Sequence, residues 1–251
     1  MTLEDRSSPM AEGETRVALL AGGSGFVGGF ALDVLLDAPD VGRVFAVTRR
    51  PLGREHPRLA NRIVQFERIE AQLAGLTCRF ALCCLGTTLR QAGSEQAFRQ
   101  VDVDAVLAFA RAAKAAQAQR FVVVSSAGAN PQSKNFYLRT KGEVEVALAG
   151  IGFPCLDILQ PSVLLGWRRE MRPVELAARA LMPLVNPFLT GAREAYRGIP
   201  ARTVGEAMVG VVRSSRRGVQ RYTYSAIQAL ARIKPVRMIG PAESKPQSRS
   251  S

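Results

Sequence analysis

The fold is decided by the stretch Arg16-Val-Ala-Leu-Leu-Ala-Gly-Gly-Ser-Gly-Phe-Val-Gly28. Its first six residues are an apolar run that predicts a buried strand, and apolar residues at helical spacing over 26–36 predict the helix that follows. The glycines between them fit either Gly22-x-x-Gly25-x-x-Gly28 or Gly23-x-Gly25-x-x-Gly28. In both patterns the turn needs backbone angles that glycine reaches easily, and a pyrophosphate can approach the backbone with no Cβ in the way. This strand–turn–helix context predicts a dinucleotide site made by Gly22, Ser24, Gly25, Phe26, Val27 and Gly28.

Strands and helices continue to alternate beyond this turn. Further strands are predicted over 43–48, 63–66, 79–85, 120–125 and 155–159, and further helices over 94–118 and 135–149. Near-continuous apolar strands are typical of parallel sheets buried on both faces. The pattern therefore predicts an α/β fold with a Rossmann-like doubly wound parallel sheet, which binds ligands beyond the carboxyl ends of its strands.

We expect a single domain over residues 15–239, because 251 residues suffice for one substantial core. The ends, 1–14 and 240–251, are rich in Ser, Pro, Glu and Lys and are predicted to be disordered tails. The portion from 155 to 239 is less regular and is expected to form a small cover on the substrate side. The elements expected late in it are helices over 173–189 and 203–213 and a strand over 221–224.

The composition is that of an ordinary globular protein, with 47% hydrophobic and 22% charged residues. No apolar run approaches the ~20 residues that cross a bilayer. The N-terminal segment is polar, unlike a signal peptide, so we expect a cytoplasmic protein. The four cysteines lie mostly in apolar segments and are expected to be free thiols. Neither they nor the single histidine, His56, have metal-ligand spacing, so no metal site is expected.

The net charge of +13 arises from 34 basic and 21 acidic residues. Such a balance can favour nucleic acid, anionic membranes or phosphorylated ligands. The basic residues here are scattered and do not alternate with aromatic residues, so no nucleic-acid partner is expected. The expected partner is a small-molecule substrate, and a homodimer is left open.

The end of the second predicted strand indicates which nucleotide is bound. An NAD site usually carries Asp or Glu there, to hold the ribose hydroxyls. This strand instead ends Val47-Thr48-Arg49-Arg50. Guanidinium groups suit a 2′-phosphate, so NADP(H) is favoured over NAD(H). The alternative is that one of the two arginines is an ordinary surface charge.

Three side chains suit proton transfer at a carbonyl oxygen. Tyr137 and Lys141 lie four residues apart on one face of the helix predicted over 135–149. Ser126 ends the apolar run 121–126, so its hydroxyl is expected beside the start of that helix. A nearby ammonium stabilises a phenolate, which lets a tyrosine act as general acid and base. Ser125 is the competing candidate for the hydroxyl role.

Together these residues resemble the short-chain dehydrogenase/reductase superfamily. Three further stretches narrow the resemblance: Cys83-Cys-Leu-Gly-Thr-Thr88, Val101-Asp-Val-Asp104, and Ser133-Lys-Asn-Phe-Tyr-Leu138 leading to Lys141-Gly-Glu-Val-Glu145. Over roughly residues 16–215 the chain is similar to the atypical branch that includes the Tat-interacting, oxidoreductase-like tumour-suppressor proteins and their bacterial relatives.

The resemblance implies an NADP(H)-binding oxidoreductase that transfers hydride to or from a small carbonyl or alcohol. It places Gly22, Gly25 and Gly28 at the pyrophosphate, Arg49 and Arg50 at the adenosine phosphate, Leu85, Gly86 and Thr87 at the ribose, and Ser126, Tyr137 and Lys141 at the reacting oxygen, with Tyr137 and Lys141 also binding the cofactor. Pro161 is expected near the nicotinamide because the strand predicted over 155–159 ends just before it. Two alternatives stay open, a catalytically silent NADP(H) sensor and an assembly factor of Rossmann type.

The chain departs from the superfamily in two places. Asp102 stands where members often have Asn. The C-terminal portion is short compared with that of nucleotide-sugar epimerases, which argues against a sugar-nucleotide substrate.

Overall fold

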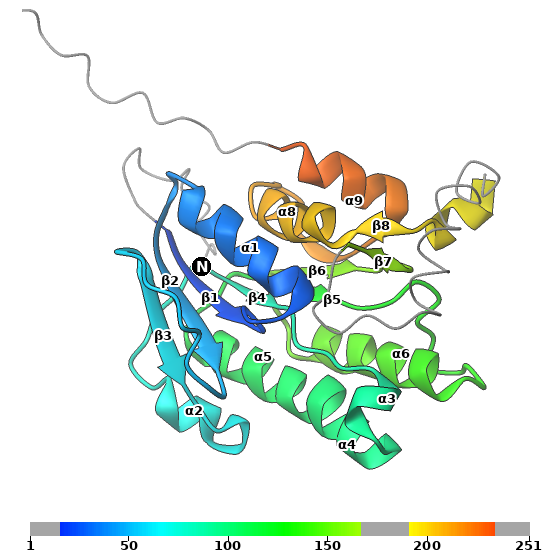
Figure 1. Cartoon of the computed structure of the whole chain (residues 1–251), viewed down its shortest axis with the longest axis horizontal. Helices are drawn as coiled ribbons and strands as arrows, with labels where there is room; N and C mark the ends of the chain where they lie inside the picture. The colour runs from blue at the N-terminus through cyan, green and yellow to red at the C-terminus, as the bar shows by residue number, and fades with distance from the viewer. Residues whose placement is uncertain (1–15, 167–190, 234–251) are drawn as a thin grey trace, which may run out of the picture.

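A computed structural model of the chain describes residues 16–166 and 191–233 (Figure 1). The described part has three layers, with a parallel sheet between two layers of helices, and this confirms the predicted Rossmann-like α/β fold. The tails predicted at 1–14 and 240–251, and the helix predicted over 173–189, lie outside the described residues.

Within the described ranges the central sheet has seven parallel strands in the order β3-β2-β1-β4-β5-β6-β9. They are β1 (Arg16–Ala21), β2 (Val41–Thr48), β3 (Leu59–Ile63), β4 (Phe80–Cys83), β5 (Arg120–Val124), β6 (Cys155–Leu159) and β9 (Gly218–Tyr222). A smaller parallel pair joins β7 (Leu164–Leu165) to β8 (Ile199–Pro200). The strand order changes direction between β1 and β4, which is where doubly wound sheets open a ligand crevice.

Helices cover both faces of the sheet (Figure 1). On one face lie α1 (Phe26–Asp37), α8 (Ala201–Val211) and α9 (Tyr224–Ala231). On the other lie α2 (Ile69–Gln72), α5 (Val106–Ala115) and α6 (Phe136–Gly150), with α3 (Leu89–Ala92) and α4 (Glu95–Arg99) at the carboxyl edge. Single 3-10 segments occupy Phe66–Arg68 and Gly191–Tyr196, and a π-helical segment, Gln100–Ala105, joins α4 to α5.

Each face of the sheet has its own apolar core. Leu32 of α1 and Val204 of α8 are buried on one face, and Phe109 of α5 and Leu148 of α6 on the other. Burying a side chain of this size contributes about 1.5–3 kcal/mol. Gly205 allows α8 to lie close to α1, because a Cβ there would come within 2.8 Å of the Ala31 nitrogen.

Three sequence predictions needed correction. The third strand lies at Leu59–Ile63 and not at 63–66, because this edge strand carries polar residues that an apolar pattern does not detect. Asn61 in it donates from Nδ2 to the Ala46 carbonyl at 3.0 Å. The helix predicted over 94–118 is interrupted by the π-helical segment. The strand predicted over 221–224 lies at Gly218–Tyr222, and α9, which was not predicted, begins two residues later.

Arg120 joins the start of β5 to segments that come much later in the chain. Its Nη1 lies 2.8 Å from Oδ2 of Asp157 and donates to the Val211 carbonyl at 3.0 Å. Its Nη2 donates to the carbonyls of Ser214 at 2.7 Å and Arg216 at 2.8 Å. The buried guanidinium thus pairs with a buried carboxylate on β6 and donates hydrogen bonds to carbonyl groups at and just after the end of α8.

Candidate functional site

The turn between β1 and α1 has no room for side chains at two of its glycines. Gly22 has φ +81°, and a Cβ there would lie 2.6 Å from the Cys84 carbonyl atoms. A Cβ on Gly28 would lie 2.0 Å from the Gly22 oxygen. The turn is closed by the Gly25 amide, which donates to the Gly22 oxygen at 2.9 Å. The turn therefore presses against the end of β4 and directs the N-terminus of α1, the positive end of its dipole, into the crevice.

The geometry distinguishes the two glycine patterns. A Cβ on Gly23 would meet a side-chain atom of Leu20 at 3.3 Å, and that atom can move. Gly22 and Gly28 face backbone atoms instead, so the Gly22-x-x-Gly25-x-x-Gly28 pattern describes the steric requirement better.

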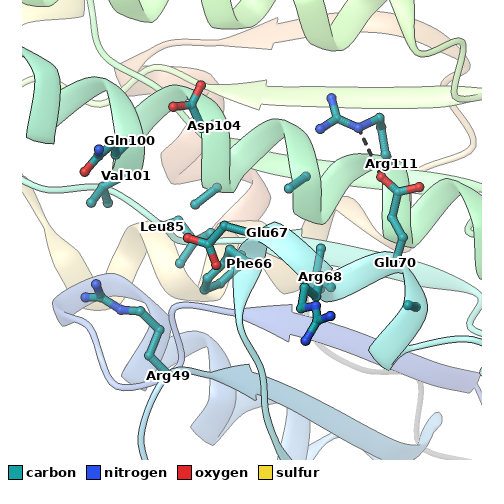
Figure 2. A pocket seen from close by; sticks show the side chains of 14 residues that line it. Arg49, Phe66, Glu67, Arg68, Glu70, Leu85, Gln100, Val101, Asp104 and Arg111 are labelled. Carbon is teal, nitrogen blue, oxygen red and sulfur yellow. Dashed lines mark hydrogen bonds and ion pairs between the residues drawn. The ribbon is translucent and has the colours of Figure 1, made fainter.

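A cleft of about 800 Å³ lies between the segments that follow β2, β3 and β4 and the helical layer of α5 (Figure 2). Arg49, which follows β2, lines one end of it, and Leu85, which follows β4, lines its middle. The Glu70–Arg111 ion pair, 3.2 Å long, lies at the other end. Both predicted arginines are exposed, but only Arg49 lines the cleft; Arg50 does not.

Sequence reasoning missed several residues that line this cleft. Phe66, Glu67 and Arg68 follow β3, whose position was predicted four residues too late. Val101 and Ala105 belong to the π-helical segment. With β3 placed correctly, the rule that ligands meet the carboxyl ends of parallel strands would have pointed to the first three.

Lys141 and Asp102 form a buried ion pair at the carboxyl edge of the sheet. The Lys141 Nζ lies 2.6 Å from Asp102 Oδ1, and Oδ2 of Asp102 accepts the Thr87 amide at 2.8 Å. Burial acts to lower the pKa of Lys141, but attraction to Asp102, together with Tyr137 and Cys83, outweighs it and raises the pKa above its usual value. Lys141 is therefore an ammonium.

Tyr137 lies beside this ion pair in the first turn of α6. Its ring centroid is 6.0 Å from the Lys141 Nζ and 5.7 Å from the ring of Phe98. The helix begins at Asn135, whose Oδ1 accepts the Leu138 amide at 3.1 Å. This N-cap fixes the start of the helix, so that Tyr137 and Lys141 project toward the same edge of the sheet.

The two candidate serines have different surroundings. The buried Ser125 donates from Oγ to Glu145 Oε1 at 2.6 Å. Glu145 is further held by Gln160 and Arg221, each at 2.8 Å. The half-buried Ser126 makes only a 3.4 Å contact with the Ala127 oxygen in the part of the chain that is described. The hydroxyl of Ser125 is thus committed to the fold, and Ser126 is the better candidate for contact with a substrate.

The loop after Ser126 contacts both α6 and the segment after β6. The Asn130 amide donates to the Leu138 oxygen at 3.1 Å, next to Tyr137. The Ala127 amide donates to the Pro161 oxygen at 2.9 Å. A Cβ placed on Gly86 would lie 3.8 Å from the Lys141 Nζ, so the end of β4 reaches the same place. The sequence-predicted residues 85–87, 126, 137, 141 and 161 therefore gather at one end of the sheet.

Within residues 16–166 and 191–233, no group of three or more His, Cys, Asp or Glu side chains could hold a metal ion. Burial raises the pKa of Cys78 and Cys83 to about 12, so both are neutral thiols. Over the same residues, no helix has the length and apolar character needed to span a bilayer.

Comparison of the sequence with protein-family models gave no match. Among curated proteins, the chain is 33% identical over 201 residues to Protein HTATIP2 of Rattus norvegicus, which covers 78% of this chain and 81% of that protein. It is 36% identical over 165 residues to Protein FMP52, mitochondrial, of Lodderomyces elongisporus, covering 61% and 69%. A third relative, fmp52 of Aspergillus fumigatus, is also named mitochondrial, with 32% identity over 70% of this chain and 79% of that protein.

Solved structures share the fold at low sequence identity. A UDP-N-acetylglucosamine 4-epimerase from Methanobrevibacter ruminantium superposes with a TM-score of 0.62 at 16% identity, covering 84% of this chain and 77% of the other. The Bordetella bronchiseptica enzyme WbmH, solved in complex with NAD+, also gives 0.62 at 16% identity, covering 87% and 80%. These similarities show the architecture alone.

Proposed function

The chain belongs to the atypical short-chain dehydrogenase/reductase family that includes HTATIP2 and FMP52, and on this basis we propose that it is an NADP(H)-dependent oxidoreductase. Its reaction is hydride transfer to or from a small carbonyl or alcohol, with Tyr137 as general acid and base. The observation that carries the proposal is the buried ammonium of Lys141, 6.0 Å from the Tyr137 ring centroid at the ligand edge of the sheet.

The described residues fit a nicotinamide dinucleotide phosphate. Gly22 and Gly28 leave the backbone of the turn bare for a pyrophosphate, and Arg49 at the cleft suits the 2′-phosphate. Fold neighbours solved in complex with NAD support a nicotinamide cofactor. When bound, NADPH supplies the hydride. The protein would position the ring through Lys141 and the segment 85–87, and would handle the proton through Tyr137 and Ser126.

Arg49 and Arg50 are predicted to set the preference for NADPH. Replacing both with Ala should weaken NADPH binding about 10- to 100-fold, the equivalent of one or two charge-assisted hydrogen bonds, and leave NADH binding nearly unchanged. Isothermal titration calorimetry of both nucleotides measures this. Arg49→Ala alone should cause most of the loss, because Arg49 lines the cleft and Arg50 does not. Arg54→Ala is the control, since Arg54 is exposed and paired with Asp33. An equal loss for NADPH and NADH would refute a 2′-phosphate site at these arginines.

Gly28 is predicted to be indispensable for nucleotide binding. An Ala there places Cβ 2.0 Å from the Gly22 oxygen, so the turn must move away from its position against β4. We expect Gly28→Ala to raise the Kd for NADPH about 100-fold, or about 2.7 kcal/mol. Gly29→Ala is a matched control one residue on, because its Cβ would meet only the Gly23 oxygen at 3.8 Å. Similar binding by both variants would contradict the role of the turn.

The reaction itself is tested by incubating the protein with NADPH and a panel of aldehydes, ketones and quinones. Consumption of NADPH that depends on one class of carbonyl is the expected result. A nucleotide sugar belongs in the panel, because fold neighbours include a UDP-sugar epimerase, and we expect no conversion of it. Tight NADPH binding without turnover on any member would favour the silent-sensor alternative.

Location and assembly are part of the same proposal. We propose a cytoplasmic protein, although the fungal relatives are mitochondrial by name. Fractionation of the cells that make the protein decides between the two locations, and analytical ultracentrifugation decides between monomer and homodimer.

A further inference from the structure

Asp102 supplies the Lys141 ammonium with a counter-charge that is fully buried. The side chain of Asp102 is 0% exposed and that of Lys141 8%, and their charged atoms are 2.6 Å apart. The second carboxylate oxygen accepts the Thr87 amide at 2.8 Å, which joins the pair to the segment that follows β4. Asp102 lies in the π-helical segment, and π-helical turns inside helices are frequent at functional sites.

Two other titratable groups act on Lys141, and two further carboxylates of α6 are each paired with an arginine. The groups that act on Lys141 besides Asp102 are Tyr137 from its own helix and Cys83 from β4, a neutral thiol whose pKa burial raises to about 12. On the outer side of α6, Glu143 is 2.8 Å from Arg99, and one turn beyond Lys141, Glu145 is 2.8 Å from Arg221. Among the described carboxylates, Asp102 is therefore the one that compensates Lys141.

We propose that Asp102 is a positioning residue that holds Lys141 and offsets its charge, so that the phenol of Tyr137 keeps its proton and serves as the acid in carbonyl reduction. The proposal rests on the proposed function. An unpaired ammonium strongly favours a neighbouring phenolate, whereas a close ion pair is nearly neutral and does so less. An Asn at this position could accept the Thr87 amide but would leave the ammonium uncompensated.

Reduction at this site adds one hydride and one proton to the carbonyl group. The carbonyl carbon accepts the hydride that NADPH supplies, the π electron pair moves to the oxygen, and that oxygen takes the proton of Tyr137. The products are an alcohol, NADP+ and a phenolate, which solvent reprotonates. Because this step needs a protonated phenol, the charge on Asp102 would extend reduction to higher pH.

The test is a pH titration of the phenolate absorbance of the protein without nucleotide. The chain has four tyrosines, so the titration of Tyr137→Phe is subtracted to remove the absorbance of the other three. For each further variant, the curve subtracted is that of the same variant with Tyr137→Phe added. We expect D102N to move the midpoint of the Tyr137 titration to lower pH by about one unit. Glu143→Gln, which removes an acidic charge from the exposed side of α6, should leave the midpoint in place.

A double variant keeps the inference testable if D102N folds poorly. D102N/K141M removes both buried charges, which proteins tolerate better than removing one. The Tyr137 titration midpoint of the double variant should return to the wild-type pH, and the midpoint of K141M alone should lie at higher pH than wild type. Equal midpoints for K141M and the double variant, or an unmoved midpoint in D102N, would overturn the role of Asp102.

Kinetics then separate this inference from the proposed function. If a carbonyl substrate is found, kcat/KM for its reduction should fall at high pH. In D102N this fall should begin at lower pH, by the same shift as the Tyr137 titration midpoint, and D102E should return it to the wild-type pH. A shifted titration without any turnover would refute the oxidoreductase and leave the role of Asp102 standing. Tyr137-dependent turnover with an unshifted titration would refute the role of Asp102 alone.

Discussion

Replacing Tyr137 with Phe should lower kcat for carbonyl reduction about 10²- to 10⁴-fold, the usual contribution of a general acid. The substitution removes only the hydroxyl, and the ring can keep its place 5.7 Å from Phe98 and 6.0 Å from the Lys141 Nζ. NADPH affinity should therefore stay within about twofold, so the loss falls on kcat and not on cofactor binding. Stopped-flow measurement of NADPH oxidation gives the rate, and calorimetry gives the affinity.

Tyr224→Phe is a suitable control for that experiment. Tyr224 opens α9, which lies on the opposite face of the sheet from α6, and Arg197 lies over its ring at 5.5 Å. This variant should turn over at the wild-type rate. If Tyr137→Phe turns over at the wild-type rate, Tyr137 is not the proton donor.

Replacing Arg120 with Met should lower the free energy of unfolding by about 3–5 kcal/mol, the cost of leaving one member of a buried ion pair alone. Asp157 is 1% exposed, and burial raises its pKa even with Arg120 beside it. Without the guanidinium, the hydrogen bond that remains to Asp157 among the described residues is that of the Tyr222 hydroxyl, which donates to Oδ1 at 2.9 Å, and Arg216 is the remaining cation that acts on it. Urea denaturation followed by circular dichroism measures the change, and the melting temperature should fall by roughly 10 °C.

Two further variants identify the cause of that loss. Arg120→Met with Asp157→Leu should regain part of the stability, because no charge is then left buried without a partner. Tyr222→Phe should cost only about 1.5–3 kcal/mol, since it removes one hydrogen bond to the carboxylate. Wild-type stability in Arg120→Met would mean that water replaces the guanidinium at Asp157.

The sequence was sufficient where structure depends on local pattern. β1 and β6 lie where the apolar runs predicted them, because central strands of a parallel sheet are buried on both faces. The glycines at 22 and 28 were identified because the turn itself needs a positive φ at Gly22 and a close approach of Gly28 to the Gly22 oxygen, whereas the contact of Gly22 with Cys84 was not visible in the sequence. The preference for Ser126 over Ser125 could not be settled, since it depends on Glu145, twenty residues away in the chain.

The residues that line the cleft could not be predicted from the sequence, because they come from segments far apart in the chain. The walls of the cleft come from the segments that follow β2, β3 and β4, from the π-helical segment and from α5, and their facing residues share no spacing that a pattern could detect. β3 is an edge strand, in which Asn61 and Arg62 replace the expected apolar run. Asp102 was visible as a departure from the family, but its ion pair with Lys141 depends on how the π-helical segment packs against α6.

The hydrogen bonds of Arg120 can form only late in the synthesis of the protein. A ribosome releases β1 to β6 before α8 and β9, and the carbonyls that Arg120 needs follow it by 91 to 96 residues. At a synthesis rate of about 5–20 residues per second, these carbonyls emerge roughly 5–20 s after Arg120. Over that interval β6 is an unpaired edge of the sheet, open to pairing with another nascent chain. Truncation before Gly218 would make that exposure permanent, so β9 protects the newly made protein from aggregation as well as pairing with the edge of the described sheet.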